Sequence, residues 1–456
     1  MDKGFFRDKR VVIMGLGSFG GGADSALFAA RAGARTCVTD MSPAEKLAAA
    51  MEPLKGLPID YHLGEHREED FRTADIVIVN PAVRPDNPFV LLARKSKALV
   101  TSQIELFFQM CPAPIIGITG ANGKSTTTSL TAHLLEAGIG QSGIAYKKVL
   151  LSGNIGNHPL LALLDELTAK HLVVLELSSF QLEQLACIQK APYASIITNL
   201  TPNHIDRHGT FEAYCRAKET IFKYQPLDVQ HPCLSVFNAE DTITRAWFSK
   251  YHTQSGRKAL AFSADDVPDR LLPDFRCPGR ANRSNLAAAL AVATHFGVEP
   301  SRIAEAVKTF YPLDNRLQRI AEKRGVRWYD DSKATTPVST LAALEGIDEP
   351  KILIAGGYDK GIDFSELGKC IARRAKAVVL IGQTAPKIEQ AIRAAGDSTV
   401  AINHAASMPE AVKLCDELAA PGDVVLMSPA CASYDMFLNY VQRAQIFIEA
   451  VNNLPQ

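Results

Sequence analysis

Residues 117–126 read G-I-T-G-A-N-G-K-S-T, a glycine-rich stretch that ends in a lysine, a serine and a threonine. The apolar run "PIIGI" precedes it, and a helical pattern follows it as far as Gly138. A strand, a glycine loop and a helix in this order direct backbone N–H groups and the positive helix end toward phosphate. Lys124 can then reach the β- and γ-phosphates, and Ser125 can bind Mg²⁺. The segment predicts an ATP site, although Ile118 replaces the first glycine of the usual pattern.

A second glycine motif, G-L-G-S-F-G at 15–20, matches the dinucleotide fingerprint without error, and Asp40 lies 20 residues after Gly20. This spacing fits an NAD site, with the acidic residue on the ribose. The same backbone N–H groups would serve the diphosphate of a UDP-sugar equally well. A ligand-free turn of the same shape is a third reading.

Two charged residues stand in apolar surroundings. Glu176 comes near the end of the apolar run "HLVVLEL", which places it either at the ligand-binding edge of a sheet, where it could bind Mg²⁺, or in a turn. In "FEAYCRAKETIF" (211–222), Lys218 is the one charge on a helical face that is otherwise apolar. An apolar setting lowers the pKa of a lysine and favours the nucleophilic amine, whereas a snorkelling lysine is the structural alternative.

Short apolar runs alternate with helical stretches along the chain, which predicts an α/β fold with parallel sheets covered by helices on both faces. The expected strands lie at 10–15, 75–80, 113–120, 171–177, 194–200, 351–357, 377–382 and 423–429. Proline-containing breaks place domain boundaries near 112 and 312.

The composition excludes several classes of protein. Among the 456 residues, Lys+Arg and Asp+Glu both number 49, so no net field favours nucleic acid or an anionic membrane. The apolar run at the N-terminus is too short for a signal peptide or a membrane anchor. The nine cysteines are scattered without a C-x-x-C pair, which indicates reduced thiols and a cytoplasmic location.

A series of motifs resembles the Mur ligase family, the ATP-dependent ligases of peptidoglycan precursor synthesis. T-G-A-N-G-K-S-T opens the central part, and the other motifs follow in family order: "GNIG" (153–156), "LELSSFQLE" (175–183), "NLTPNHIDRH" (199–208), "FEAYCRAKETIF" (211–222), "YDDSKATT" (329–336) and "SPACASYDMFLNY" (428–440). The resemblance implies three domains: a Rossmann-like domain for the UDP-substrate at 1–112, a P-loop ATPase-like ATP domain at 113–312, and a Rossmann-like amino-acid domain at 313–456.

The last two motifs are similar to those of the family branch that adds D-glutamate. The resemblance therefore implies that UDP-N-acetylmuramoyl-L-alanine and D-glutamate are the substrates and that ATP and Mg²⁺ are required. It favours a UDP-substrate over NAD at the first glycine motif, and it implies an enzyme that acts as a monomer without nucleic acid or membrane.

The resemblance also assigns individual residues. As catalytic groups it implies Lys124, Glu176, His204 and Lys218, the last carrying a carbamate formed with CO₂, and as metal ligands Ser125, Glu176, His204 and carbamylated Lys218. The implied ATP contacts are Gly120, Ala121, Asn122, Gly123, Lys124, Ser125, Thr126, Asn282, Arg316 and Asp331. The implied UDP-substrate contacts are Gly17, Ser18, Phe19, Asp40, Asn154 and Ser178, and those to D-glutamate are Thr335, Lys360, Ser433 and Tyr440; Lys333 lies near the reacting groups.

At three positions the chain departs from the family pattern. Ala281 and Asn315 stand where the family has histidine, and Tyr440 replaces a phenylalanine. A side-chain role at 281 is therefore not expected here, and the added hydroxyl of Tyr440 changes the edge of the predicted amino-acid pocket.

Overall fold

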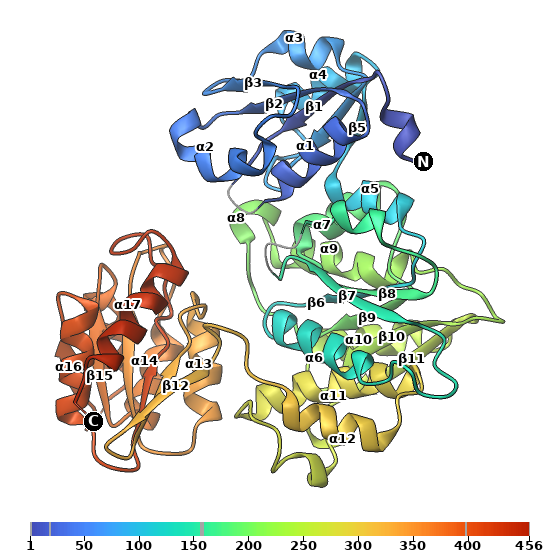
Figure 1. The fold of residues 1–456 in the computed structure, drawn as a ribbon. Coiled ribbons are helices and arrows are strands. Elements are labelled where there is room, and N and C mark those ends of the chain that lie inside the picture. Colours follow the sequence, from blue (N-terminus) through green and yellow to red (C-terminus); the bar gives the residue numbers. More distant parts are fainter. Residues whose placement is uncertain (1, 18–19, 156–158, 397–398, 456) are drawn as a thin grey trace. The chain divides into compact units, whose positions relative to one another are not determined.

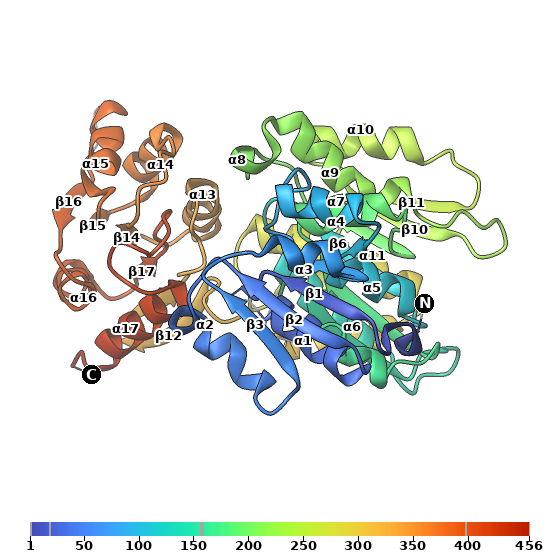
Figure 2. The same ribbon diagram turned by 90° about the horizontal axis from the view of Figure 1, so that it is seen from above.

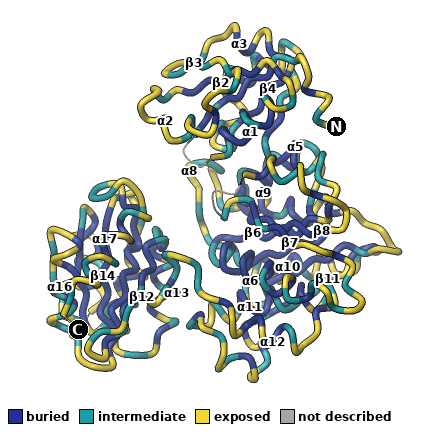
Figure 3. The backbone as a smooth tube through the Cα atoms, in the orientation of Figure 1, coloured by how far each residue is buried: buried dark blue, intermediate teal, exposed yellow. Residues whose placement is uncertain are grey.

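The computed structural model describes residues 2–17, 20–155, 159–396 and 399–455. Its strands form a five-stranded sheet and two six-stranded sheets (Figure 1). By its internal contacts the chain divides into two compact units, one made of Met1–Asp266 with Asn285–Ala306 and the other of Val267–Ser284 with Val307–Gln456. The middle strands of each sheet are buried, the edge strands β3, β12 and β16 are partly exposed, and many exposed positions lie in loops (Figure 3).

The N-terminal sheet has the order β3-β2-β1-β4-β5, and its strand pairs are all parallel. Alternate residues of β1 point to opposite faces: Val11 and Ile13 pack toward α1, and Val12 and Met14 pack toward α3 and α4. The elements are η1 (Lys3–Phe6), β1 (Arg10–Met14), α1 (Gly21–Arg31), β2 (Arg35–Asp40), α2 (Ala44–Met51), η2 (Glu52–Leu54), β3 (Ile59–Leu63), α3 (Glu68–Thr73), β4 (Ile76–Val79), α4 (Pro88–Lys95), β5 (Leu99–Thr101) and α5 (Gln103–Met110).

The central sheet, order β11-β10-β9-β6-β8-β7, is also parallel throughout its described pairs. Its middle strands are apolar on both faces, because helices cover both sides. The elements are β6 (Ile115–Thr119), α6 (Lys124–Glu136), β7 (Lys148–Gly153), η3 (Ala162–Asp165), β8 (His171–Glu176), α7 (Ser179–Cys187), β9 (Ala194–Ile197), α8 (Ile205–His208), α9 (Phe211–Lys223), β10 (Cys233–Asn238), α10 (Thr242–Tyr251), β11 (Arg257–Phe262), η4 (Ala264–Asp266), η5 (Asp269–Leu271), α11 (Arg280–His295) and α12 (Pro300–Thr309).

The C-terminal sheet has the order β12-β13-β17-β14-β15-β16. Helices α13, α14 and α15 cover one face, and α16 and α17 cover the other (Figure 2). The elements are β12 (Gln318–Lys323), β13 (Val326–Asp330), α13 (Pro337–Gly346), β14 (Lys351–Gly356), α14 (Ser365–Arg374), β15 (Ala377–Ile381), α15 (Ala385–Ala394), β16 (Ala401–His404), α16 (Met408–Leu418), β17 (Val424–Met427) and α17 (Tyr440–Asn452).

The predicted fold class is confirmed: the chain is α/β, built on parallel sheets. One pair differs, since β12 and β13 are antiparallel and joined by a tight turn in which Arg324 and Gly325 both have positive φ. The three sheets lie within the three predicted ranges, and the segment 267–284 groups by its contacts with the C-terminal part. Among the described residues, none of the helices combines the length and apolar character that a membrane span requires.

Candidate active site

The glycine loop at 120–123 joins β6 to α6 in a shape that only glycine fits. Gly120 and Gly123 have φ values of 148° and 80°. A Cβ atom at Gly120 would lie 1.8 Å from Thr198 Oγ1, and one at Gly123 would lie 2.3 Å from Asn285 Oδ1. The two glycines therefore let neighbouring polar side chains approach the loop backbone, while the loop opens directly into the positive end of α6.

The segment that follows β9 holds this loop in place. The N–H of Ala121 donates to Asn199 O over 2.8 Å, and that of Asn122 donates to Asn199 Oδ1 over 2.9 Å. Thr198 Oγ1 returns a hydrogen bond of 2.6 Å to Asn122 O. Lys124 Nζ folds back onto Ala121 O at 2.8 Å. The loop is thus prearranged by Thr198 and Asn199, which lie at the end of the strand predicted at 194–200 and are not among the predicted site residues.

Lys218 is buried, with 2% of its surface exposed, on the inward face of α9. Its Nζ donates to Thr119 Oγ1 at 3.0 Å and lies 4.9 Å from the centre of the Tyr214 ring. Burial, together with the positive charge of Lys124, lowers the pKa of Lys218 well below its ordinary value, and the negative charge of Glu176 opposes this shift. The structure therefore rules out a snorkelling side chain and favours a neutral amine beside the nucleotide loop.

Glu176 ends β8 as a buried carboxylate at the carboxyl edge of the sheet. Asn154 after β7 contacts it twice: its N–H donates to the Glu176 carbonyl over 2.9 Å, and its Nδ2 donates to Oε1 over 3.0 Å. These bonds join the ends of β7 and β8. Asn154 is exposed, so it can also meet a ligand.

His204 begins α8 with a left-handed φ of 53° and remains exposed. Partial desolvation, followed by the positive charges of Lys124 and Lys218, lowers its pKa and favours the neutral ring. The neighbouring His208 has a structural setting instead, because it contacts Ser179 Oγ at 2.9 Å and stacks on Phe180. The positive charges of Lys124 in the nucleotide loop and of Lys218 on α9 therefore both act on His204.

The side chains of Ser125, Glu176, His204 and Lys218 suit a magnesium ion in part. Mg²⁺ prefers hydroxyl, carboxylate and phosphate oxygens, which Ser125, Glu176 and a bound nucleotide can supply. A lysine amine is not such a ligand, whereas a carbamate on Lys218 would present two oxygens that share one negative charge. The residues of the central domain thus fit the metal provided that Lys218 is modified.

The backbone of the N-terminal glycine motif is hydrogen-bonded to Asp40, the residue that the spacing would assign to a ribose. Asp40 Oδ2 accepts the N–H of Leu16 at 2.9 Å and that of Gly17 at 3.3 Å, and Oδ1 accepts Ser42 N at 2.8 Å. These turn N–H groups are thus already satisfied within the domain. Ser18 and Phe19 lie outside the described residues. Ser178, another expected substrate contact, caps α7 in a reciprocal pair with Gln181.

In the C-terminal unit Asp331 and Lys333 follow β13, Arg316 precedes β12, and Asn282 lies in the first turn of α11. Asp331 is buried. Its carboxylate accepts a hydrogen bond from the N–H of Leu317 at 3.1 Å and another from Ser428 Oγ at 2.7 Å. Burial raises the pKa of Asp331 to about 7. Lys333 Nζ stands 5.5 Å from the centre of the Tyr440 ring. Asn282 Nδ2 donates to Pro278 O at 2.8 Å, and Arg316 exerts a favourable charge on Asp331.

The expected amino-acid loops adjoin one another in the same unit. Tyr358 N donates to Ala432 O over 2.8 Å, which places the loop that carries Lys360 beside the loop that carries Ser433. Ser433 is buried, Lys360 is exposed, and Thr335 is half-buried. The geometry therefore assembles two of the predicted carboxylate-binding segments.

Arg443 of α17 links two of these loops through hydrogen bonds. It is not among the predicted site residues. Its guanidinium is fully buried and donates to Ser332 Oγ at 3.0 Å, to Ser332 O at 2.8 Å and to Cys431 O at 3.0 Å. Ser332 Oγ in turn donates to Tyr440 O at 2.8 Å. Within the described part of the chain the hydrogen bonds of Arg443 go to carbonyl and hydroxyl oxygens, so this buried arginine positions the backbone of both loops. A lone cation on the apolar face of α17 was its signal in the sequence.

Comparison with known proteins decides the family. Residues 118–293 match the model of the Mur ligase middle domain, and residues 315–431 match that of the Mur ligase glutamate ligase domain. A UDP-N-acetylmuramoylalanine–D-glutamate ligase of Roseiflexus sp. is 40% identical and covers 98% of both chains. The chain belongs to the Mur ligase family. A second relative with the same name, from Symbiobacterium thermophilum, is 37% identical over 92% of this chain and 93% of its own.

Solved structures agree with this Mur ligase in fold. The UDP-N-acetylmuramate-alanine ligase MurC of Thermotoga maritima aligns with a TM-score of 0.61 at 20% identity over 97% of this chain and 99% of that chain. MurF of Thermotoga maritima, solved in complex with ADP, aligns at 0.55 and 16% identity over 98% and 95%. As a member of the family, this Mur ligase is an ATP-dependent enzyme that forms an amide bond in peptidoglycan precursor synthesis.

Proposed function

We propose that this Mur ligase joins D-glutamate to UDP-N-acetylmuramoyl-L-alanine and converts ATP to ADP and phosphate. The observation that carries the proposal is the near full-length similarity to ligases named for these two substrates. We assign the UDP-substrate to residues 1–112, ATP to 113–312 and the amino acid to 313–456, each range holding one sheet.

In the first step an oxygen of the L-alanyl carboxylate attacks the γ-phosphorus of ATP, and the bond to the β,γ-bridging oxygen breaks. This leaves an acyl phosphate and ADP. Such a transfer depends on positioning and on neutralising charge. The loop of Gly120, Ala121, Asn122 and Gly123 would bind the phosphates with its backbone, and Lys124, Ser125 and Thr126 would meet them at the start of α6. Arg316, Asn282 and Asp331 would contact the rest of the nucleotide.

Lys218 would act as a carbamate. Its neutral amine adds to CO₂, a proton leaves, and the buried neutral group becomes a buried anion. Such an anion offsets the charge of Lys124 and completes, with Ser125, Glu176 and His204, an oxygen-rich set of metal ligands. Mg²⁺ bound there would supply charge neutralisation for the phosphates.

In the second step the amine of D-glutamate attacks the acyl carbon, phosphate leaves, and the nitrogen loses a proton to give the amide. Thr335, Lys360, Ser433 and the backbone of Tyr440 would hold the two carboxylates. Lys333, beside the Tyr440 ring, would meet the negative charge that develops on the leaving phosphate.

The UDP-substrate would occupy the carboxyl edge of the N-terminal sheet, near Gly17, Ser18, Phe19 and Asp40, and extend to Asn154 and Ser178. Asp40 would act by fixing the turn of the glycine motif. We further propose that the enzyme works as a monomer in the cytoplasm.

Product formation tests this proposal. The full chain is incubated with ATP, Mg²⁺, D-glutamate and UDP-N-acetylmuramoyl-L-alanine labelled with ¹⁸O in its carboxylate, and the products are analysed by mass spectrometry. We expect the amide product and one ¹⁸O in the released phosphate, and neither with Lys124→Ala. Amide without ¹⁸O in phosphate would exclude the acyl phosphate, and absence of the amide would exclude the assigned substrates.

A further inference from the structure

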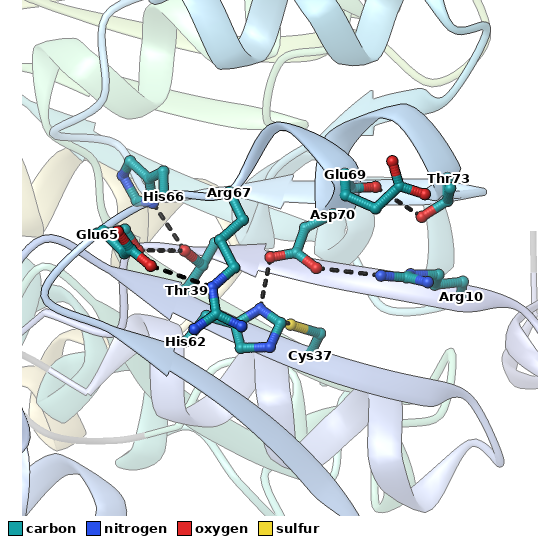
Figure 4. A network of polar contacts seen from close by, with 10 residues as sticks. All are labelled: Arg10, Cys37, Thr39, His62, Glu65, His66, Arg67, Glu69, Asp70 and Thr73. Atoms are coloured by element: carbon teal, nitrogen blue, oxygen red, sulfur yellow. Dashed lines mark hydrogen bonds and ion pairs between the residues drawn. The ribbon is translucent and has the colours of Figure 1, made fainter.

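A cysteine, a histidine and an aspartate converge beside the N-terminal sheet (Figure 4). Cys37 Sγ on β2 lies 3.6 Å from His62 Nδ1 on β3, and the same Nδ1 lies 2.6 Å from Asp70 Oδ2 on α3. The three ligand atoms all lie within 4.8 Å of one another. The roles that we propose for the ligase reaction use none of these residues.

The fold fixes these side chains in a common space. Parallel pairing of β2 with β3 sets Thr39 opposite His62, so Cys37 and His62 point to the same face of the sheet, and α3 lies over that face. Cys37 and Asp70 are buried, at 5% and 2% exposure. The His62 side chain is 24% exposed on the edge strand β3, which gives the cluster a path to solvent.

The two carboxylate oxygens of Asp70 contact different neighbours, Arg10 and His62. Arg10 Nη2 donates to Oδ1 at 3.0 Å, which leaves Oδ2 directed at His62. A cation between His62 and Cys37 would therefore meet one free carboxylate oxygen while Arg10 orients the carboxylate from behind. Arg67, the other basic residue nearby, is paired with Glu65 at 3.2 Å.

We propose that Cys37, His62 and Asp70 form a zinc site, with water as the fourth ligand. One sulfur, one imidazole nitrogen and one carboxylate oxygen are ligands that Zn²⁺ accepts in tetrahedral geometry, with the fourth position open. Mg²⁺ and Ca²⁺ prefer oxygen alone and would not select a thiol.

Zinc would lie between His62 Nδ1 and Asp70 Oδ2, which are 2.6 Å apart without it. Two ligands on a tetrahedral zinc stand roughly 3.3 Å apart when their bonds are about 2.0 Å long, so these two atoms have to move apart by less than an ångström from that separation. Zinc binds the thiolate of Cys37, and the thiol proton leaves to solvent. Zinc also requires Nδ1 of His62 to be free of a proton, so a neutral ring on the metal carries its proton on Nε2. The bound ion would tie β2, β3 and α3 together.

Cobalt(II) provides the test, because a cobalt–thiolate bond gives a near-ultraviolet charge-transfer band that oxygen and nitrogen ligands do not. The full chain is reduced, freed of metal, and titrated with Co²⁺ in excess Mg²⁺, which occupies oxygen-rich sites. We expect the band to saturate at one cobalt per chain and to disappear when one equivalent of Zn²⁺ is added.

Variants identify the thiolate. Cys37→Ser should remove the band, whereas Cys233→Ser, a buried strand cysteine of the central domain, should leave it unchanged. His62→Gln should raise the cobalt dissociation constant roughly tenfold or more while thermal unfolding in chelator stays near that of the parent. A thiolate band that persists in Cys37→Ser, or no band in the parent chain, would overturn the proposal.

Discussion

The amine of Lys218 on α9 donates a hydrogen bond to the hydroxyl of Thr119 at the end of β6, over 3.0 Å. Thr119 Oγ1 in turn donates to Leu177 O at 2.7 Å, next to Glu176. These two hydrogen bonds connect the buried Lys218 with β6, which leads into the nucleotide loop, and with the end of β8, which carries the candidate metal ligand Glu176. A charged ammonium would be costly at this position, and an anion formed on the amine would face Lys124.

The carbamate hypothesis can be tested on Lys218 itself. Lys218→Arg should lose at least ~100-fold in kcat, since a guanidinium stays cationic and cannot take up CO₂. The matched control is Lys223→Arg on the same helix, where the side chain is exposed and activity should be unchanged. A small carboxylic acid added to Lys218→Ala should restore part of the turnover. Full activity in Lys218→Arg would exclude the carbamate.

Substitution of Gly123 tests the nucleotide loop. A Cβ there would meet Asn285 Oδ1 at 2.3 Å, whereas Gly140 has a similar φ of 79° and nothing within 4 Å. Both alanine variants carry the left-handed backbone cost of about 1–2 kcal/mol, so they match in strain. We expect Gly123→Ala to raise the KM for ATP at least ~10-fold and Gly140→Ala to leave it unchanged. Equal KM values would show that the contact with Asn285 does not shape the ATP site.

Arg443 should control the affinity for the amino acid although it lies behind the loops. Arg443→Lys loses the forked contacts to Ser332 and Cys431. The KM for D-glutamate should rise ~10-fold, and the KM for the UDP-substrate should not change. Arg393→Lys, a surface variant on α15, provides the control. A fall in kcat without any change in the D-glutamate KM would contradict this positioning role.

Asp331 should make the C-terminal unit less stable as the pH rises. Burial raises its pKa to about 7 from an ordinary value of 3.8, so between these values the folded state holds a proton that the unfolded state has lost. Stability from this group is therefore greatest below pH 4, falls toward pH 7 and is level above it. Between pH 5 and pH 8 the unfolding free energy should fall by about 2–3 kcal/mol.

The fluorescence of buried Trp328 can report this unfolding if Trp247 is replaced by phenylalanine, since the chain has two tryptophans. Asp331→Asn should remove the pH-dependent part. A pH dependence that survives in Asp331→Asn would assign it to other groups, such as Asp330, whose pKa burial also raises.

Local sequence was sufficient to predict the nucleotide loop and Lys218, because each rests on a short pattern within one strand–loop–helix unit or one helix. The hydrogen bonds by which Thr198 and Asn199 hold the nucleotide loop were not predicted, since they depend on β9 lying beside β6. The cluster of Cys37, His62 and Asp70 was not predicted for a related reason. β2 and β3 read "RTCVTD" and "IDYHL", in which polar residues interrupt the apolar pattern, and β3 is a partly exposed edge strand. For the hairpin of β12 and β13 the sequence offered only Gly325, at the second position of the two-residue turn, because an arginine at the first position is not typical of such turns.

The most direct test of the central claim is ADP release by the full chain in the presence of UDP-N-acetylmuramoyl-L-alanine, ATP and Mg²⁺, with D- and L-amino acids added one at a time. Release should depend on D-glutamate and stay at background with L-glutamate, because Thr335, Lys360 and Ser433 would hold both carboxylates and let only one enantiomer present its amine to the acyl phosphate. Equal rates with both enantiomers, or preference for a diamino acid, would contradict the assignment of D-glutamate as the substrate.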